Sequence, residues 1–404
     1  MPFFRHDFNH RFTDAKYADL RRSLDRRTRS TIDLRVAETP VFLPEAMIRE
    51  MAEAGAAMTH QLVNNLEYQR LADSTIPNDF RVANCDAHPN FMTADFALVE
   101  EDGTLKPKLV ELQAFPSVYG YQAVLNQEYR RCFELDPRLH SYLGVNDEQY
   151  WEAMRQVVVA DHDPANVILM EVTPQLQKTL PDFHVHEDHL GIRTVDITQI
   201  SQRGSKLFYS RDGVDTPIHR IYNRAIADEM LRKDIRPSFD LTADLDVEWA
   251  GHPNWYFKIS KFSLPFLKHP AVPPSVFLDD FLAGKRPSGL SDDREDWIFK
   301  PLFSFAGKGI EFAPSDQILE SIPVEDRANY LIQQRMHFVS NVETPFGLTQ
   351  AEIRILYTWP DHGELRPLNT LVRLGRGKMM GVDHNRDQLW VGGSAGLIVT
   401  ENLL

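Results

Sequence analysis

The stretch Trp297-Ile-Phe-Lys-Pro-Leu-Phe-Ser-Phe-Ala-Gly-Lys-Gly309 decides how this chain is interpreted. It predicts a β-strand that carries Lys300, a turn that contains glycine, and a returning strand over Ile310-Glu-Phe312. A hairpin of this kind places backbone N–H groups over phosphates while the lysine neutralises them. A plain hairpin turn with a surface lysine gives the same pattern, and the Walker A spacing is absent.

A second segment, Tyr330-Leu-Ile-Gln-Gln-Arg-Met336, follows further along the chain. It predicts a short apolar strand with a polar end, as expected of a segment that hydrogen-bonds the edge of an adenine ring. In this interpretation the base is received by Gln333, Gln334, Arg335 and Met336. The two segments together predict an ATP site. No G-x-G-x-x-G sequence follows a strand, so a Rossmann dinucleotide site has no support.

The composition and net charge of the chain limit the kinds of molecule that it is expected to bind. The 404 residues are enough for two or three domains. A formal net charge of −14 argues against nucleic acid or an anionic membrane as the main partner, because counterion release needs a basic surface. No run of about 18 apolar residues predicts a membrane span. The first residues lack the apolar core of a signal peptide, and the two cysteines imply no disulfide framework, so a cytoplasmic protein is expected.

The hydrophobic pattern divides the chain into four predicted parts. Residues 1–80 form a helical segment that wraps the surface and contains an amphipathic helix over 44–63. Residues 81–125 contain two strands, over 91–98 and 106–113, joined by a turn. Residues 126–250 alternate helices with buried strands and so predict a small parallel α/β unit. Residues 251–404 begin with a helix over 254–268, continue with the Lys300 hairpin and end in strands.

Three oxygen-bearing side chains lie on the two predicted strands of residues 81–125. Asp95 is in the middle of the first strand, and Glu111 and Gln113 end the second. Residues i and i+2 of a strand face the same side, so Glu111 and Gln113 project together and Asp95 is able to join them. Hard oxygen ligands suit Mg²⁺, and burying two acids among apolar residues is costly without a cation. The alternative is an exposed sheet face with solvated carboxylates.

This order of motifs resembles the glutathionylspermidine synthase-like group of the ATP-grasp superfamily, whose ATP-grasp is circularly permuted. In that group the metal-binding strands come first, as Asp followed by Glu-x-Asn, and Asp95, Glu111 and Gln113 fall at matching places. Ser260-Lys-Phe-Ser-Leu-Pro-Phe-Leu267 is similar to the helix that carries the first phosphate lysine of the family, which makes Lys261 its counterpart. The resemblance extends loosely over residues 85–400.

The resemblance implies an α+β (α/β) fold, ATP-grasp-like, with a small parallel α/β subdomain and an N-terminal helical segment. It implies ATP and Mg²⁺ as cofactors and a ligase that joins a small-molecule carboxylate to an amine through an acyl phosphate. Nucleotide binding falls to Lys261, Lys300, Gly307, Lys308, Gly309 and the segment Gln333–Met336, and metal binding to Asp95, Glu111 and Gln113.

Two departures from the family pattern keep other functions open. Gln113 stands in place of Asn, and Thr93 stands where the family often has an arginine that supports transition-state charge. Arg354 or Arg224 is the candidate to supply that charge instead. The alternatives are an ATP-binding protein without ligase activity, with a regulatory or scaffold role, and a small-molecule kinase. The sequence does not determine the oligomeric state.

Three further segments have two interpretations each. His184-Val-His-Glu-Asp-His189 is interpreted as a solvated loop rather than a zinc site. Trp390-Val-Gly-Gly-Ser-Ala-Gly396 is either an anion-binding segment or a tight turn. Phe115-Pro-Ser-Val-Tyr-Gly-Tyr-Gln122 lines a substrate pocket or serves as a buried connector.

Overall fold

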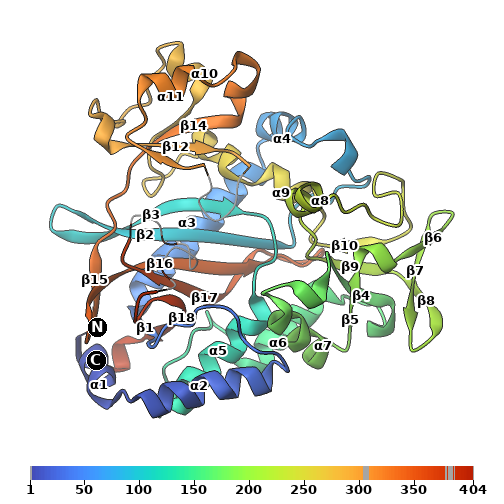
Figure 1. Cartoon of the computed structure of the whole chain (residues 1–404), viewed down its shortest axis with the longest axis horizontal. Helices are drawn as coiled ribbons and strands as arrows, with labels where there is room; N and C mark the ends of the chain where they lie inside the picture. The colour runs from blue at the N-terminus through green and yellow to red at the C-terminus, as the bar shows by residue number, and fades with distance from the viewer. Residues whose placement is uncertain (1, 304–308, 378–379, 381–384, 386, 404) are drawn as a thin grey trace.

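The largest element of the fold is a seven-stranded sheet with strand order β1-β18-β17-β16-β2-β3, in which β15 also pairs with β16 (Figure 1). The computed structural model describes residues 2–303, 309–377, 380, 385 and 387–403. Neighbouring strands are antiparallel except β1 and β18, which are parallel. The strands are β1 (Val41–Pro44), β2 (Phe91–Glu101), β3 (Thr104–Gln113), β15 (Ser340–Thr344), β16 (Gly347–Thr358), β17 (Arg366–Gly375) and β18 (Gly392–Val399).

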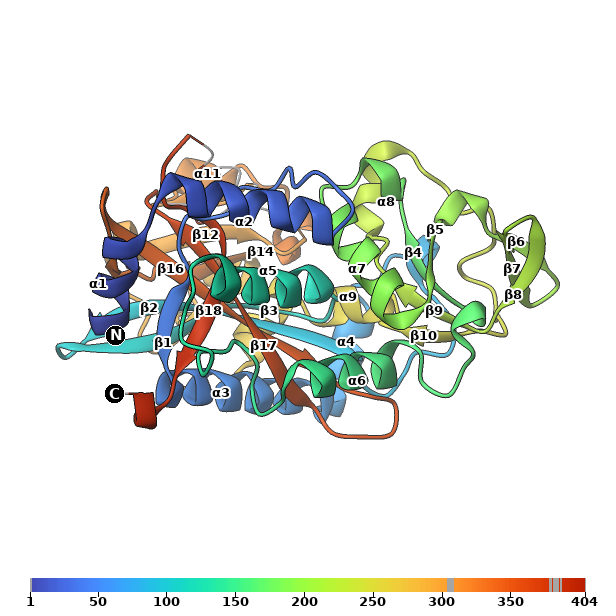
Figure 2. The same ribbon diagram turned by 90° about the horizontal axis from the view of Figure 1, so that it is seen from below.

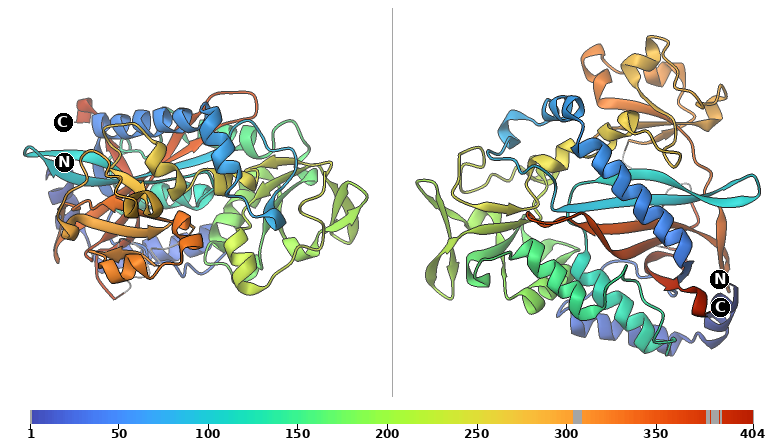
Figure 3. Two further views of the ribbon diagram at one scale, coloured as in Figure 1. Left: turned by 90° about the horizontal axis from the view of Figure 1, so that it is seen from above. Right: turned by 180° about the vertical axis from the view of Figure 1, so that it is seen from behind.

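One face of this sheet is apolar because alternate residues of its strands are apolar. Helix α3 (Glu45–Val63) packs against that face and runs diagonally across it, as the right-hand view of Figure 3 shows. The shared core includes Met51, Met58 and Leu62 of the helix with Met92, Ala94, Phe96, Ile353 and Ile355 of the sheet. The predicted amphipathic helix and its buried stripe are therefore confirmed.

The opposite face is covered in part by α5 (Tyr119–Cys132), and α2 (Asp14–Arg27) packs on α5 (Figure 2). The short helix α1 (Pro2–Arg11) precedes α2 and contacts β1. Gln122 of α5 donates hydrogen bonds to main-chain oxygens of β17 and β18, at Thr370 and Ser394. Helices α1, α2 and α3 of the N-terminal segment thus contribute to the cores on the two faces of the main sheet, and the same segment also supplies β1.

A parallel sheet of order β10-β9-β4-β5 forms a second unit beside the main sheet. Its strands are β4 (Val167–Glu171), β5 (Arg193–Asp196), β9 (Arg220–Asn223) and β10 (Glu248–Ala250). Helices α6 (Asp147–Val158), α7 (Leu180–Leu190) and α8 (Ala227–Lys233) accompany it. A small antiparallel sheet of β6 (Ser201–Arg203), β7 (Lys206–Arg211) and β8 (Val214–Ile218) adjoins it. The predicted parallel α/β unit is confirmed.

The third unit is an antiparallel sheet of order β11-β14-β12-β13, drawn at the top of Figure 1. Its strands are β11 (Ser275–Phe277), β12 (Trp297–Pro301), β13 (Glu311–Phe312) and β14 (Tyr330–Gln334). Short helices α10 (Leu278–Leu282) and α11 (Asp316–Glu320) belong to this unit, and α4 (Leu66–Asp73) and α9 (Asn254–Lys258) lie between it and the other two. Because β12 pairs with β13 in register Ile298 to Phe312, the predicted Lys300 hairpin is confirmed.

Two local predictions were wrong, and one of two open interpretations of a third segment is excluded. The helix expected over 254–268 ends at Lys258, and a 3-10 turn over Lys261–Phe266 that contains Pro265 follows it. The histidine-rich segment 184–189 lies in α7 rather than in a solvated loop, because its apolar residues Phe183, Val185 and Leu190 pack into the core. Residues 392–396 are part of strand β18 rather than a tight turn.

Candidate functional site

A cluster of charged side chains lies on the sheet face opposite α3. Asp95 of β2 is aligned with Glu111 of β3 on one side and with Arg354 of β16 on the other. Met92, Ala94 and Phe96 point to the α3 core, so the strand alternation turns Asp95 to the other face. The strand pairing therefore brings together charges that are far apart in the sequence.

Asp95 is bound by two arginines. Arg354 makes a bidentate pair with it, with Nε 2.5 Å from Oδ1 and Nη2 2.6 Å from Oδ2, and Arg373 Nη2 also donates to Oδ2. Burial of Asp95, whose side chain is 1% exposed, disfavours its charge, but the two guanidinium groups outweigh that effect and hold its pKa below the usual value. Asp95 is therefore an ionised, fully buried carboxylate.

The sequence interpretation missed two members of this cluster, Glu352 and Arg373. Arg373 of β17 donates from Nε to Glu352 Oε1 at 2.7 Å, and burial raises the pKa of the Glu352 carboxyl. A signal was available, because Glu352 and Arg354 are charged residues at i and i+2 in an otherwise apolar strand. Only the pairing of β16 with β17 shows that Arg373 joins them.

The two predicted metal ligands on β3 lie next to each other and beside a lysine. Gln113 Nε2 donates to Glu111 Oε1 at 2.9 Å, and Lys261 Nζ lies 3.8 Å from Glu111 Oε2. Arg354 Nη2 lies 3.4 Å from Gln113 Oε1, so all three predicted ligands meet at one place. Within the described ranges, no three His, Cys, Asp or Glu side chains are grouped closely enough to hold a metal ion.

The donor atoms of this group suit Mg²⁺ only in part. Glu111 and Gln113 offer hard oxygens from one face of β3, which is the chemistry that this ion prefers. Both oxygens of Asp95 already accept from arginines. A magnesium ion at this place would therefore take Glu111 and Gln113 from the protein and complete its shell with phosphate and water oxygens.

Lys300 of β12 is buried, and its ammonium group is directed at a glutamine of the neighbouring strand. Its Nζ donates to Gln333 Oε1 at 2.6 Å, and Gln333 Nε2 donates in turn to Ser275 Oγ. Burial lowers the pKa of Lys300 to about 8, while the negative charge of Glu111 acts in the opposite direction. Lys300 and Glu111 thus influence each other electrostatically although they belong to different sheets.

A small pocket adjoins this charged group. It contains about 430 Å³ of empty space, part of which is open to solvent. Polar side chains of Glu111, Gln113 and Lys261 meet aromatic rings there, and the full lining is Glu111, Gln113, Ala114, Phe115, Tyr256, Ile259, Ser260, Lys261, Leu302 and Phe303. The position of Phe115 agrees with the pocket-lining interpretation of its segment, although α5 already begins at Tyr119.

The glycine loop is described only at its end. Gly309 has φ +75°, and a Cβ there would lie 3.2 Å from Pro301 Cγ, so the turn requires glycine at this position. The predicted phosphate-loop residues Gly307 and Lys308 lie outside the described residues. The assignment of this loop to phosphates stays a prediction.

The predicted adenine-binding residues have contacts within the protein. Gln334 N donates to Pro274 O at 2.8 Å and Arg335 N to Asp296 O at 2.6 Å, while Gln333 is turned to Lys300. Met336 follows the end of β14 and is half-buried. Their role toward adenine stays a prediction.

The two candidate arginines have different surroundings. Arg354 shares the sheet face of Glu111 and Gln113, and its Nη1 donates to Ser117 Oγ at 3.1 Å. Arg224, which follows β9, donates from Nη1 to the main-chain oxygens of Pro116 and Ser117. The role of either arginine in charge stabilisation stays a prediction.

Comparison with known proteins supports the fold. No protein-family model matches the chain, and no curated protein matches its sequence. Among solved structures, the chain is similar to a glutathione synthetase-like effector from Globodera pallida in its apo form, with a TM-score of 0.57 and 13% sequence identity. The match covers 91% of this chain and 96% of the effector. The chain therefore shares the mixed α+β fold of this glutathione synthetase-like protein.

Within the described residues, no helix is long and apolar enough to cross a bilayer.

Proposed function

We propose that this glutathione synthetase-like chain is an ATP- and Mg²⁺-dependent ligase that joins a small-molecule carboxylate to an amine. One observation carries the proposal. Two lysines from separate elements, Lys261 and Lys300, come close enough to the acidic end of β3 to interact electrostatically with Glu111. Two cations near a carboxylate and an amide suit a polyphosphate that binds together with a divalent ion.

The proposed chemistry has two steps. An oxygen of the substrate carboxylate attacks the γ-phosphorus of ATP, the bond to the bridging oxygen breaks, and ADP leaves with the electron pair. The amine nitrogen then attacks the carbonyl carbon of the acyl phosphate, inorganic phosphate leaves, and the nitrogen loses a proton. Catalysis of such transfers is mostly positioning and charge neutralisation.

Each residue of the site has a proposed task. Lys261 and Lys300 neutralise the phosphate oxygens, and Arg354 supports the charge that develops during transfer. Glu111 and Gln113 would hold the Mg²⁺, with Asp95 fixing Arg354 from the neighbouring strand. The bound ion would supply charge neutralisation at the phosphates.

A specific observation favours a second candidate, an ATP-binding protein without ligase activity. Asp95 is already paired with Arg354 and Arg373, so a metal ion would have to compete with two guanidinium groups for its oxygens. A site with one carboxylate ligand fewer would bind nucleotide with weaker metal support. A small-molecule kinase is the third candidate, since it needs the same phosphate-binding groups.

The first experiment measures unfolding temperature with and without Mg-ATP. A ligand at about 100 times its Kd adds roughly 2.7 kcal/mol to the free energy of unfolding, which raises the midpoint visibly. Lys300→Met should lose the shift. Lys258→Met is the matched control, because Lys258 is also buried but pairs with Asp73 and lies over Trp255. A wild-type protein with no shift at millimolar Mg-ATP would rule out the proposal.

A trapping assay then separates the three functions. Hydroxylamine converts an acyl phosphate into a hydroxamate, so a ligase forms hydroxamate from ATP and its carboxylate substrate. A kinase gives a phosphorylated product that hydroxylamine leaves intact. An ATP-binding protein without catalysis gives neither product while retaining the thermal shift.

A further inference from the structure

A buried network links the parallel α/β unit to the charged face of the main sheet. It is centred on Arg224, which lies just beyond the end of β9, at the carboxyl edge of the parallel sheet. Its guanidinium lies 5.5 Å from the ring centre of Phe115 and 5.6 Å from that of Phe183. Only 5% of the residue is exposed, so the guanidinium is buried and has two aromatic rings close to it.

The guanidinium group is directed at the linker that follows β3. Arg224 Nη1 donates to Pro116 O and, at 3.0 Å, to Ser117 O. These residues follow Gln113 after a few positions and precede α5. Because one guanidinium fixes two successive carbonyl oxygens, it sets the path of the chain at the point where it leaves the candidate site.

The same linker contacts the arginine that binds Asp95. Ser117 Oγ accepts from Arg354 Nη1 at 3.1 Å, while Nε and Nη2 of Arg354 bind the two oxygens of Asp95. The linker therefore has a cation on each side. Arg224 donates to the main-chain oxygens of the linker, and the side chain of Ser117 in the linker accepts from Arg354.

Asp182 of α7 forms an ion pair with Arg224. Asp182 is fully buried, its Oδ1 accepts from Tyr121 N at 2.9 Å, and its Oδ2 lies 4.0 Å from Arg224 Nη2. The same Oδ2 lies 3.6 Å from His186 Nδ1. Asp182 thus contacts both Arg224 and the first turn of α5. The linker is therefore held by Arg224 at Pro116 and Ser117, and the helix that follows it is held by Asp182.

We propose that Arg224 is a positioning residue, which acts through the Pro116–Ser117 linker to set the orientation of Arg354 at the candidate site. The buried carboxylate of Asp182 lies beside Arg224 and attracts its guanidinium group. This inference deepens the proposed function, because it assigns the transition-state charge to Arg354 and gives Arg224 an indirect role. A small displacement of Arg354 lowers the rate without lowering nucleotide affinity, since Arg224 contacts no phosphate-binding lysine in the described residues.

The test compares Arg224→Lys with Arg220→Lys. Arg220, the first residue of β9, is a matched control, because it is also buried and also donates to two successive carbonyl oxygens, those of Val157 and Val158. Its other partners are Glu248 and Asp361, which have no contact with Arg354. Both variants remove a buried guanidinium and retain a positive charge, so both report the structural cost of the change.

The first measurement does not depend on any reaction. The Nε–Hε signal of Arg354 in the ¹H–¹⁵N spectrum of the whole protein, assigned by its loss in Arg354→Lys, reports the pair with Asp95. Arg224→Lys and Ser117→Ala should shift this signal, and Arg220→Lys should leave it in place. If Arg224→Lys moves the signal no more than Arg220→Lys does, the positioning role is overturned, whether or not the protein binds Mg-ATP.

The second measurement needs the trapping assay. Arg224→Lys should lower the rate of hydroxamate formation by roughly 10- to 100-fold, while the KM for ATP and the Mg-ATP thermal shift stay within about twofold of the wild type. An equal loss in Arg220→Lys would indicate only structural damage and contradict the proposal. A wild-type protein that forms no hydroxamate counts against the ligase function alone, and the signal of Arg354 then decides the positioning role.

Discussion

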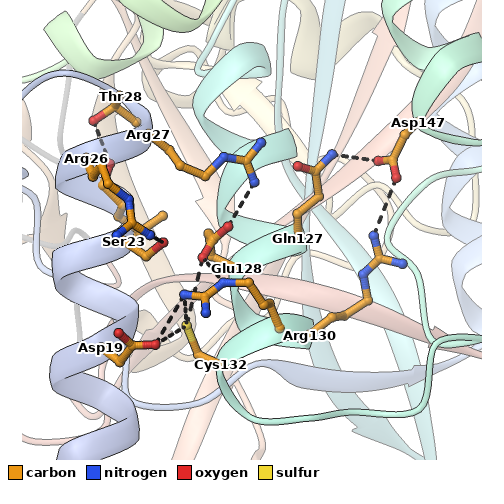
Figure 4. A network of polar contacts seen from close by, with 12 residues as sticks. Asp19, Ser23, Arg26, Arg27, Thr28, Gln127, Glu128, Arg130, Cys132 and Asp147 are labelled. Carbon is orange, nitrogen blue, oxygen red and sulfur yellow. Dashed lines mark hydrogen bonds and ion pairs between the residues drawn. The ribbon is translucent and has the colours of Figure 1, made fainter.

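Two ionic networks of this protein are built from the same residue types but differ in burial. The first surrounds Asp95, where every partner comes from a different strand of one sheet. The second joins α2 to α5, and Figure 4 shows Asp19, Arg27 and Glu128 of this network. Glu128 accepts from Arg27 Nη1 at 2.9 Å and from Arg131 Nε at 2.7 Å. Arg131 also reaches Asp19, which lies at the surface.

The difference in burial changes what each ion pair does. In the Asp95 cluster, Asp95, Glu352 and Arg354 are buried and Arg373 is 23% exposed, so removing one partner leaves a buried charge uncompensated. In the α2–α5 network, Asp19 and Arg131 are about half exposed, so water and salt replace a lost partner. Similar contact distances therefore predict different energies, and burial decides which network is costly to disturb.

The largest expected effect is that of Asp95→Ala. The substitution leaves Arg354 and Arg373 without their shared carboxylate, and we expect a loss of about 3–5 kcal/mol in the free energy of unfolding. Chemical denaturation measures it. The control is Thr93→Val on the same strand face, because the buried Thr93 hydroxyl has no hydrogen-bond partner and its removal should be nearly neutral. Equal stability of the two variants would contradict the comparison.

The second prediction concerns pH and Lys300. Because burial lowers its pKa to about 8, Lys300 is protonated below that pH and loses its charge above it. If the charged form binds phosphate, Mg-ATP affinity should be constant below pH 7 and about tenfold weaker at pH 9, which corresponds to about 1.4 kcal/mol.

Titration of Mg-ATP across this pH range measures the effect. Lys300→Arg is the control, since a guanidinium keeps its charge and its affinity should not fall. The lowered pKa of Lys300 also determines how the free energy of unfolding depends on pH. The unfolded chain binds the Lys300 proton more tightly than the folded chain does, so this residue favours folding more as the pH rises from 8 toward the ordinary lysine value.

The third prediction concerns the buried member of the surface network. Glu128→Gln removes the charge that Arg27 and Arg131 share, and we expect a loss of about 1 kcal/mol, because both arginines retain access to water. Thermal unfolding measures it. A loss as large as that of Asp95→Ala would show that burial of the carboxylate alone, rather than of the whole network, sets the cost.

The smallest effect is expected for Asp19→Asn. Asp19 is exposed and its partners Arg131 and Arg22 are solvated, so the unfolding midpoint should not change measurably at either low or high salt. A midpoint that falls at low salt and recovers at high salt would indicate that this surface pair is stronger than its exposure suggests.

Part of the candidate site was predictable from local pattern. Glu111 and Gln113 lie side by side because residues i and i+2 of a strand share a face, and Lys300 lies on a strand because its neighbours are apolar. The hairpin of β2 and β3 and the helix over 45–63 follow from periodicity and turn residues in the same way. These features depend on residues close together in the chain.

Other features were beyond local pattern. Asp95 is separated from Arg354 by 259 positions and from Arg373 by 278, so the alternation of one strand does not reveal its partners. The histidines of 184–189 are polar enough to suggest a loop, but tertiary packing of Phe183, Val185 and Leu190 makes the segment helical. Arg224 resembles a free cation in sequence and is fixed by the carbonyl oxygens of another unit.

The sequence by itself therefore determined most of the elements and the residue types from which a nucleotide site was predicted, because periodicity and turn chemistry act over short distances. Tertiary structure alone decided which charges meet. The pairing of β2 with β3 and β16, and of β16 with β17, brings Asp95, Glu111, Glu352, Arg354 and Arg373 to one face. Burial on that face makes each charged side chain depend on its partners, because an unpaired charge removed from water is energetically costly.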